Sequence, residues 1–421
     1  MTPGADLPAA GASGGISRRS LLTGSALAVA GLAAAAAVIG PDSTADATSN
    51  RALTFRGPHQ AGIATPAQDR LVFASFDVST GDRTSLRGLL ATWTKAAERL
   101  TRGLPIGSPM GGYLPPADTG EAAGLGPANL TITVGFGASL FDHRFGLSSR
   151  RPAALEDLPS FPGDAIDPTR SGGDLCIQAC SDDPQVAFHA VHNLSRLALG
   201  TAALRWIQSG FGRTSSTTAD QQTPRNLLGF KDGTNNLLAD DVGAFDRHVW
   251  VGDETDQPWM RGGTYLVARR IRTHLEPWAA TPLSGQEDAI GRFKSSGAPL
   301  SGTREHDRVD LEALTSAGVM VIPQGAHVRA AAATSNGGAK ILRRGYSFAD
   351  GVDPATGELD AGLFFICFQK DPATQFSKIQ ANLSLNDALR SYLTHTSSSL
   401  FACPPGVTSG GTWGESLFAN H

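Results

Sequence analysis

The chain has 421 residues, of which 41% are hydrophobic and 18% are charged, and its formal net charge is −4. This balance is typical of a globular protein and excludes an intrinsically disordered one, and the length suffices for two or three domains. Acidic and basic residues are mixed without a basic run, so composition does not favour nucleic-acid binding.

The N-terminal segment has the features of an export signal. Paired arginines in SRRSLL (17–22) precede a weakly apolar, Ala-rich run (21–39), and ADA (45–47) fits a small-x-small cleavage site. These features predict a twin-arginine signal peptide over residues 1–47 and a periplasmic, cell-envelope or extracellular location. An uncleaved membrane anchor is the alternative, which the poor membrane insertion of Ala and Gly disfavours. The pathway exports folded proteins, so it hints at a cofactor.

After this segment, residues 48–65 have the composition of a linker or arm. RLVFASFDV (70–78) alternates as a strand does, and residues 84–100 have the apolar spacing of an amphipathic helix. LTITVGF (130–136) predicts a further strand. Gly- and Pro-rich loops are expected around it.

An internal repeat links the two parts of the remaining chain. DLCIQACSDDPQVAF (174–188) and GLFFICFQKDPATQF (362–376) each read as an apolar strand followed by an Asp-Pro helix start. A strand and a helical stretch also open each part, the second at GTYLVARRI (263–271). We therefore expect two similar α+β halves, residues 66–245 and 246–421, each with an antiparallel sheet covered by helices on one face.

The cysteines and a histidine pair offer no clear metal site. No CxxC or CxxCH motif is present. Cys176 and Cys180 would share one face of a strand ~13 Å apart, too far for a disulfide, so we expect buried free thiols. His189 and His192 lie three residues apart on a predicted helix. Because no acidic or thiol partner is near them in sequence, we expect a surface or partly buried pair rather than a metal site.

Three other segments are candidates for chemistry. GFKDGTNN (229–236) contains Asp-Gly, which is a common hairpin signal, but its carboxylate is equally a candidate for catalysis. His327 lies among Ala and Val residues, where a histidine is usually a core residue. ILRRGYSF (341–348) places two arginines in an apolar strand, which suggests a buried role for one of them.

Taken in order, these segments resemble the dye-decolourising haem peroxidases, and more narrowly their exported bacterial type with a twin-arginine signal. The resemblance extends from about residue 66 to the C-terminus. It implies an α+β fold of two ferredoxin-like halves with antiparallel sheets, of the dimeric α+β barrel type, enclosing a non-covalent haem b. The segments that carry it are GFKDGTNN, the His327 segment, ILRRGYSF, GLFFICFQKDP (362–372), LFACPPG (400–406), FGLSSRRPAALEDLPSFPGD (145–164) and GGDLCIQ (172–178).

The resemblance implies roles for particular residues. His327 matches the axial ligand of the haem iron, and Asp387 matches the carboxylate that makes this imidazole more basic, although a helix cap is an equal alternative for Asp387. Asp232 matches the distal carboxylate that moves a proton between the peroxide oxygens, and Arg343 the cation that stabilises the developing charge. Arg344 would point to the other face of a strand, as a structural or surface charge.

Further residues are candidates for contact with the cofactor. Gly229 and Gly233 would let the backbone approach the porphyrin closely. Arg329 would share a face with His327 if that stretch is extended, where it would pair with a haem propionate or, alternatively, form a surface salt bridge. The other candidates line the cofactor site, although core packing explains the apolar ones equally well: Thr234, Phe348, Leu363 and Phe365.

The implied function is a haem-dependent peroxidase that reduces hydrogen peroxide via a ferryl intermediate and oxidises dyes, phenols or other donors. Bulky donors would need an electron relay through Tyr346, Tyr392 or Trp259. The implied partners are peroxide, a reducing substrate and the twin-arginine translocase, with no nucleic acid and a possible homo-oligomer. One alternative is an exported haem-handling, deferrochelatase-like protein of iron or copper metabolism. Another is a periplasmic binding protein without catalysis.

Overall fold

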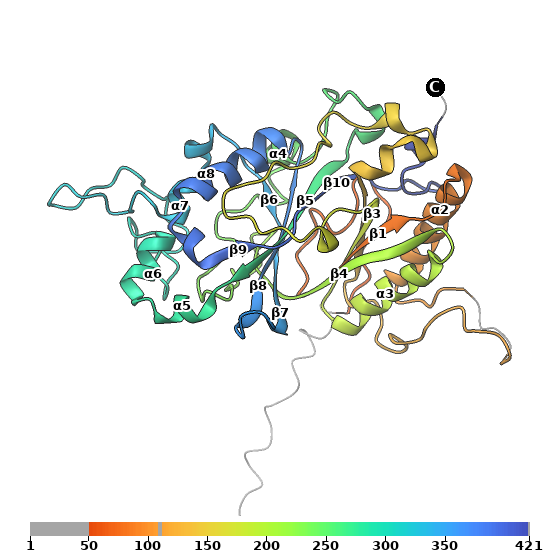
Figure 1. Cartoon of the computed structure of the whole chain (residues 1–421), viewed down its shortest axis with the longest axis horizontal. Helices are drawn as coiled ribbons and strands as arrows, with labels where there is room; N and C mark the ends of the chain where they lie inside the picture. The colour runs from red at the N-terminus through yellow and green to blue at the C-terminus, as the bar shows by residue number, and fades with distance from the viewer. Residues whose placement is uncertain (1–49, 108–111, 420–421) are drawn as a thin grey trace, which may run out of the picture. The chain divides into compact units, whose positions relative to one another are not determined.

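The computed structural model describes residues 50–107 and 112–419, and the predicted signal peptide lies outside the described residues. Two successive βαββαβ units build the fold (Figure 1). The first contains β1 (Arg70–Val78), α2 (Arg83–Leu100), β2 (Thr131–Gly137), β3 (Leu175–Ser181), α3 (Pro184–Leu197) and β4 (Ala202–Arg213). The second contains β5 (Thr264–Thr273), α5 (Leu275–Ala280), α6 (Leu283–Ile290), α7 (His327–Ala330), β7 (Tyr346–Val352), β8 (Leu359–Gln369), α8 (Lys378–Asn386) and β10 (Ser399–Cys403). Additional elements are α4 (Val242–His248), β6 (Leu342–Arg343) and β9 (Leu393–His395).

The strands form one antiparallel sheet that closes on itself. Its order is β6-β8-β7-β4-β1-β3-β2-β10-β5-β9, and β8 also pairs with β5. The order within the first half is β4-β1-β3-β2, and the order within the second half, β7-β8-β5-β10, is equivalent to it. The halves join where β4 pairs with β7 and where β2 pairs with β10. The predicted α+β fold of two ferredoxin-like halves is therefore confirmed.

Aspartates begin the helices that the sequence predicts. Asp82 accepts hydrogen bonds from two backbone N–H groups at the start of α2, and Asp183 does the same for α3, where Pro184 is the first helical residue. Asp371 holds the start of a π-helical turn (Ala373–Ser377) that leads into α8. The Asp-Pro repeat therefore starts a helix in both halves. Among the helices of the described ranges, none has the length and apolar character needed to cross a bilayer.

The two faces of the closed sheet carry different cores. The inner face contributes alternate residues of the strands to one core, which includes Phe73, Phe364 and Phe401. On the outer face of the first half, α2 and α3 cover a second core (Figure 1). Because successive strand residues point to opposite faces, Leu363 and Phe365 on β8 lie on the outer face, on either side of the inward-pointing Phe364. This outer face of the second half positions the candidate site.

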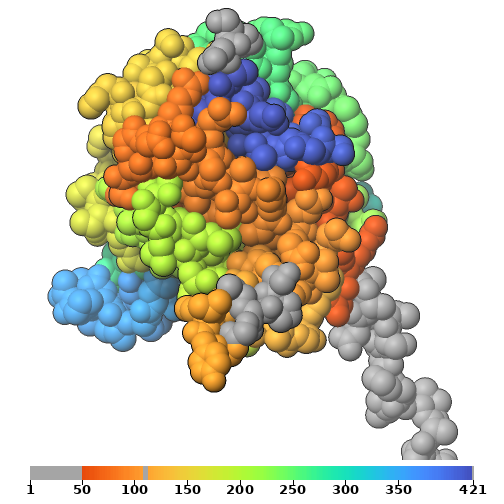
Figure 2. Space-filling model, turned by 90° about the vertical axis from the view of Figure 1, so that its right-hand side faces the viewer, coloured from red at the N-terminus to blue at the C-terminus, as the bar shows by residue number. Residues whose placement is uncertain are grey.

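The two ends of the described chain pack onto the body of the protein. In the segment that precedes β1, Gln60 donates to the carbonyl oxygens of Val134 and Pro404, both at 2.9 Å, and so contacts both halves. At the other end, the backbone N–H of Trp413 donates to Thr94 Oγ1 of α2 at 3.0 Å. Figure 2 shows this C-terminal segment, in deep blue, lying against the orange N-terminal part of the chain.

The four cysteines are buried free thiols, as predicted. Cys176 and Cys180 both belong to the inner core, and burial raises the pKa of each thiol. Their place on one face of β3 confirms the spacing argument.

Candidate active site

The acidic side chain of Asp232 contacts the basic side chain of Arg343, which lies at the end of β6. The Asp232 Oδ1 atom lies 2.6 Å from Nη1 of Arg343, and the side chains are 16% and 27% exposed. The two residues are 111 positions apart in the chain. A charge-assisted hydrogen bond of this length fixes one carboxylate oxygen relative to the guanidinium.

Asp232-Gly233 is not the corner of the hairpin, contrary to one of the two sequence interpretations. The tight turn lies earlier, because Gly229 N–H donates to Asn226 O at 2.9 Å and Arg225 bridges to Lys231. The Asp232 carboxylate therefore lies just after the hairpin, in irregular backbone, with its N–H bonded to Pro224 O at 2.9 Å. Asp-Gly is frequent in turns but does not require one, and here the turn from Asn226 to Gly229 forms the hairpin corner instead.

Two asparagines that the sequence analysis did not single out hold this pair. Asn226 donates from Nδ2 to Asp232 Oδ2 at 3.1 Å, so each carboxylate oxygen of Asp232 has a partner. Asn236, the last residue of GFKDGTNN, accepts from Arg343 N–H and donates to Arg343 O, both at 2.9 Å. This side chain bonds the backbone of β6 as a neighbouring strand would. Only the proximity of each asparagine to Asp232 could have signalled these roles in the sequence.

The two adjacent arginines have separate environments, as the strand argument predicts. Arg343 pairs with Cys367 across β6 and β8, so it lies on the outer face with Leu363 and Phe365. Arg344 is fully buried and donates to Thr65 O at 2.6 Å and to Gln68 Oε1 at 2.5 Å. The expected continuous strand is broken after Arg343, between β6 and β7. Hydrogen bonds of Arg344 therefore connect the break between β6 and β7 to the segment that precedes β1.

His327 is paired with Asp387. The His327 Nδ1 atom lies 2.6 Å from Asp387 Oδ2, and 36% of the His327 side chain is accessible. Asp387 also caps a short helix, because its Oδ1 accepts from Leu389 N–H at 2.8 Å. One oxygen of Asp387 thus pairs with His327 while the other caps a helix, so the two interpretations of this residue are compatible. With Nδ1 occupied by Asp387, the Nε2 atom of His327 is the ring nitrogen left to bind a ligand.

The electrostatics of His327 connect the two pairs. Burial by itself lowers the pKa of His327, but the charge and hydrogen bond of Asp387 outweigh it and raise this pKa above its ordinary value. The charge of Asp232 also raises the pKa of His327, and the charge of Arg343 lowers it. The charges of Asp232 and Arg343 therefore act on His327, which links the two ionic pairs.

Arg329 was expected to share a face with His327 only if that stretch of the chain were extended. The stretch around His327 is not extended but forms α7, which spans His327–Ala330. The Arg329 guanidinium donates to the carbonyl oxygens of Leu311, Ile322 and Pro323 at 2.6–3.2 Å. These bonds hold the long loop that precedes α7.

Gly229, Gly233 and Thr234 were candidates for contact with the cofactor, and in the structure each lies against other residues of the protein. Both Gly229 and Gly233 have positive φ, at 83° and 111°. A Cβ on Gly233 would lie 2.8 Å from backbone atoms of Ser215 and Ser216, so this glycine permits close packing of two loops. A Cβ on Gly229 would meet the end of the Lys294 side chain. Thr234 donates from Oγ1 to Glu305 Oε1 at 3.2 Å.

The three apolar candidates differ in exposure. Phe348 belongs to the inner core, is fully buried, and has the Arg270 guanidinium 3.9 Å from its ring centre. Core packing therefore describes Phe348. Leu363 and Phe365 are half-buried on the outer face, the face that carries Arg343. The structure brings these two, but not Phe348, to the Arg343 side of the sheet.

The aromatic residues predicted as an electron relay lie in separate places. Tyr346 is fully buried in the inner core. Trp259 is buried in the outer core, which contains residues of both halves, and its Nε1 donates to Arg150 O at 2.8 Å. Tyr392 is half-buried, bonds Thr281 Oγ1 at 2.9 Å, and packs its ring edge-on to Trp278. The three residues therefore do not form one continuous path.

Two surface hollows of the described residues lie apart from the candidate site. One, of about 560 Å³, is lined by residues 148–157, and the other, of about 280 Å³, by Arg270, Arg272 and their neighbours. Neither is lined by Asp232, Arg343, His327 or Asp387. Convergence of titratable groups, rather than the size of a hollow, identifies the site.

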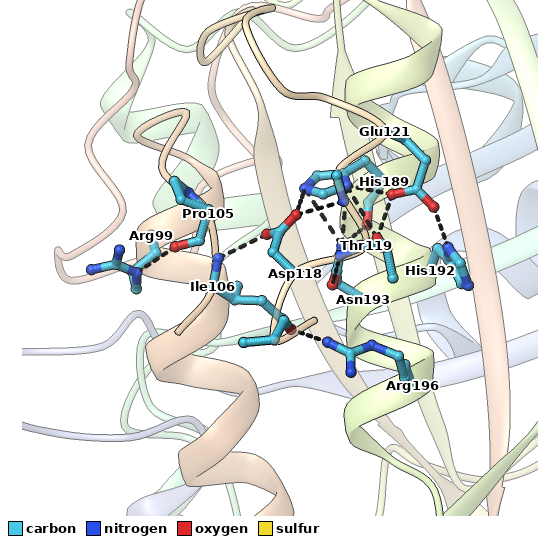
Figure 3. A network of polar contacts seen from close by, with 12 residues as sticks. Arg99, Pro105, Ile106, Asp118, Thr119, Glu121, His189, His192, Asn193 and Arg196 are labelled. Carbon is cyan, nitrogen blue, oxygen red and sulfur yellow. Dashed lines mark hydrogen bonds and ion pairs between the residues drawn. The ribbon is translucent and has the colours of Figure 1, made fainter. Parts of the chain in front are cut away.

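His189 and His192 lie in a separate polar network (Figure 3). The Glu121 carboxylate lies 2.8 Å from His189 Nδ1 and 2.5 Å from His192 Nδ1. Asp118 Oδ1 lies 3.5 Å from His189 Nε2. The acidic partners come from the loop before β2, about 70 residues earlier, which is why the local sequence did not show them. Within residues 50–107 and 112–419, no group of His, Cys, Asp or Glu is arranged to hold a metal ion.

This network makes stability depend on pH. Burial by itself raises the pKa of Glu121, but hydrogen bonds from Thr119, His189 and His192 lower it to about 2. A lowered pKa stabilises the fold above the unfolded value of ~4.5. We expect Glu121→Gln to lower the melting temperature at pH 6, and this difference to vanish as the pH falls from ~4.5 towards ~2. The exposed Glu156→Gln is the matched control. A deficit that did not change with pH would refute the ionic origin.

Comparisons with known proteins agree with this arrangement. Residues 60–212 match the family model described as Dyp-type peroxidase, N-terminal, and residues 223–408 match Dyp-type peroxidase, C-terminal. The chain is 42% identical to DtpA from Streptomyces lividans, solved as an oxyferrous complex, with a TM-score of 0.81 and coverage of 88% of this chain and 98% of DtpA. For a DyP-type peroxidase from Cellulomonas bogoriensis the identity is 38%, the TM-score 0.79 and the coverage 88% and 99%.

A curated relative carries a different name. The deferrochelatase of Yersinia pseudotuberculosis serotype I is 36% identical over 409 residues, which cover 93% of this chain and 92% of that protein. Both halves of the chain match the peroxidase models, and the fold matches the solved peroxidases. The chain therefore belongs to the Dyp-type peroxidase family, the dye-decolourising haem peroxidases that its sequence resembles, and it is an enzyme of that class.

Proposed function

We propose that this peroxidase holds a non-covalent haem b with His327 as the axial ligand and uses Asp232 and Arg343 to cleave hydrogen peroxide. The observation that carries this proposal is the convergence of two ionic pairs, His327–Asp387 and Asp232–Arg343, in one electrostatically coupled site. Relatives solved as oxyferrous complexes support an iron centre.

The side chains of the site fit a haem. An imidazole whose Nδ1 is held by a carboxylate is the usual axial arrangement for peroxidase iron. On the same outer face, Arg269 of β5 pairs with Phe365 of β8 and is fully buried. Its Nε and Nη1 atoms have no hydrogen-bond partner among the described residues. Buried guanidinium donors without a partner suit a carboxylate such as a haem propionate.

When bound, the haem supplies the iron at which peroxide is reduced. The Asp232 carboxylate accepts the proton of one peroxide oxygen and returns it to the other oxygen as water leaves. The Arg343 guanidinium stabilises the negative charge that develops when the O–O bond breaks. Asp387 holds the His327 ring in one orientation and makes it more basic. Leu363 and Phe365 present apolar surface beside Arg343, which limits water at this face.

Dyes or phenols are the proposed electron donors, and a haem-handling role is the second candidate because a curated relative is named deferrochelatase. One experiment separates them. The purified, haem-loaded protein is mixed with one equivalent of hydrogen peroxide, and the absorption spectrum and porphyrin products are followed with and without a phenolic donor. We expect fast, reversible spectral change and donor oxidation. Iron release with intact protoporphyrin, without donor oxidation, would instead support the second candidate.

Export by the twin-arginine pathway is part of the proposal. It is supported by SRRSLL and the Ala-rich run that follows it in the sequence. The twin-arginine translocase would then be a transient partner, and the mature enzyme would act in the periplasm, cell envelope or medium.

A further inference from the structure

A loop of the second half docks on the segment that carries Asp232. This loop follows α6 and includes residues 292–307. Arg225, next to the hairpin, donates to Lys294 O at 2.7 Å and to Ser295 O at 2.8 Å. Arg292 is buried and donates to Glu305 O at 3.0 Å. These bonds hold the two ends of the loop close to the hairpin.

Glu305 is the acidic residue of this loop that forms an ion pair with the motif. Its Oε2 forms an ion pair with Lys231 Nζ, and its Oε1 accepts from Thr234 Oγ1 at 3.2 Å. The Glu305 side chain is only 14% exposed. Burial by itself raises the pKa of Glu305, but hydrogen bonds from Lys231, Thr223 and Thr234 outweigh it and lower this pKa, so the group is charged at neutral pH.

The contacts of Glu305 bracket the proposed proton-transfer residue. Lys231 immediately precedes Asp232, and Thr234 follows Gly233. Asp232 and Gly233 belong to no helix or strand. Outside regular secondary structure, the orientation of Asp232 depends on individual bonds such as that of its N–H to Pro224 O, and on the side-chain contacts of its neighbours. A catalytic group must be held within a fraction of an ångström of its working position, because larger displacements cost rate steeply.

We propose that Glu305 is a positioning residue for Asp232: its carboxylate clamps Lys231 and Thr234 and thereby keeps the Asp232 carboxylate aimed at Arg343. This inference rests on the proposed function of Asp232 and extends it to a loop outside the site. Glu305 also neutralises the ammonium of Lys231, the residue that precedes Asp232 in the chain.

The ion pair between Glu305 and Lys231 makes the proposal testable by a double-variant cycle. Glu305→Gln and Lys231→Met each break the same pair, so the effect of one replacement should largely disappear when the other is already present. A residue that only stabilised the loop would show no such coupling in the rate of reaction with hydrogen peroxide.

The experiment measures the rate constant of the haem-loaded enzyme with hydrogen peroxide. We expect Glu305→Gln to slow this step about tenfold, less than the ~100-fold cost of a full ångström of displacement. Lys231→Met should also slow it, and the double variant should be little slower than the slower single variant.

Asp307→Asn is the control for simple loosening of the loop. Asp307 accepts from the backbone N–H groups of Thr303 and Arg304, both at 2.9 Å, and contacts no residue of the motif. We expect it to leave the rate unchanged. If Glu305→Gln behaved like Asp307→Asn, or if the effects of Glu305→Gln and Lys231→Met multiplied in the double variant, the positioning role would be wrong. If Asp232→Asn itself left the rate unchanged, the proposed function of Asp232 would fail instead.

Discussion

His327→Ala is expected to abolish stable haem binding while leaving the protein folded. His327 is half-buried at the start of the short helix α7, so truncating it removes a ligand without opening a core cavity. Loss of a residue that only supports a metal ligand costs ~10–100-fold in affinity, and loss of the ligand itself should cost more. Haem titration followed by Soret absorbance, with circular dichroism to check the fold, measures both. The exposed His143→Ala is the matched control and should bind haem normally.

Asp387→Asn separates ligation from the support of the ligand. Asp387 raises the pKa of His327, and the iron binds the neutral imidazole, so wild-type affinity should fall as the pH drops through this raised value. In Asp387→Asn the fall should occur at lower pH, while affinity at pH 8 is weaker because the imidazole is less basic. Unchanged haem affinity in both His327→Ala and Asp387→Asn would exclude His327 as the axial ligand.

The sequence predicts those parts of the fold that repeat or obey a simple period. The strand-and-helix unit at 174–188 recurs at 362–376, and both copies occupy equivalent places in the two halves. By contrast, β4 was not predicted. Its apolar Leu204, Ile207 and Phe211 are partly exposed, and a register shift opposite it, between Ser75 and Phe76, interrupts the pairing. The pattern of period two that identifies strands is therefore weakened there.

At the site, the sequence singled out residues that the structure pairs, but not the backbone that carries them. Asp232 pairs with Arg343, and His327 pairs with Asp387. One of the two interpretations placed a hairpin corner at Asp232-Gly233, whereas the tight turn ends at Gly229. The roles of Asn226, Asn236 and Glu305 depend on contacts between segments up to 107 residues apart. No local pattern encodes such contacts.

This difference has a physical origin. A charged group needed for chemistry is unusual in an apolar strand or beside a glycine, so its type alone attracts notice. A residue that positions such a group is an ordinary polar residue in a loop. Its importance comes from the one bond that it donates or accepts, as with Asn226 and the second oxygen of Asp232.

Replacement of Arg343 by Leu is expected to slow the reaction with hydrogen peroxide by ~100–1,000-fold, the cost of removing one donor that stabilises developing negative charge. Asp232→Asn should slow it by ~100–10,000-fold, since proton transfer by a positioned side chain contributes about that much. Both variants should retain haem, because neither residue belongs to the His327–Asp387 pair. Stopped-flow absorbance after mixing with peroxide gives the rate constants. The exposed Arg304→Leu is the control for loss of a positive charge.

The double variant tests whether the two residues act as one unit. Because Asp232 Oδ1 and Arg343 Nη1 are 2.6 Å apart, removing either one also displaces the other. We therefore expect the double variant to be little slower than the slower single variant, well short of the product of the two effects. Independent, multiplicative effects would show that the pair seen here does not act together. Wild-type rates in both single variants would remove Asp232 and Arg343 from the mechanism, and the site would have to be sought among the other residues that face His327.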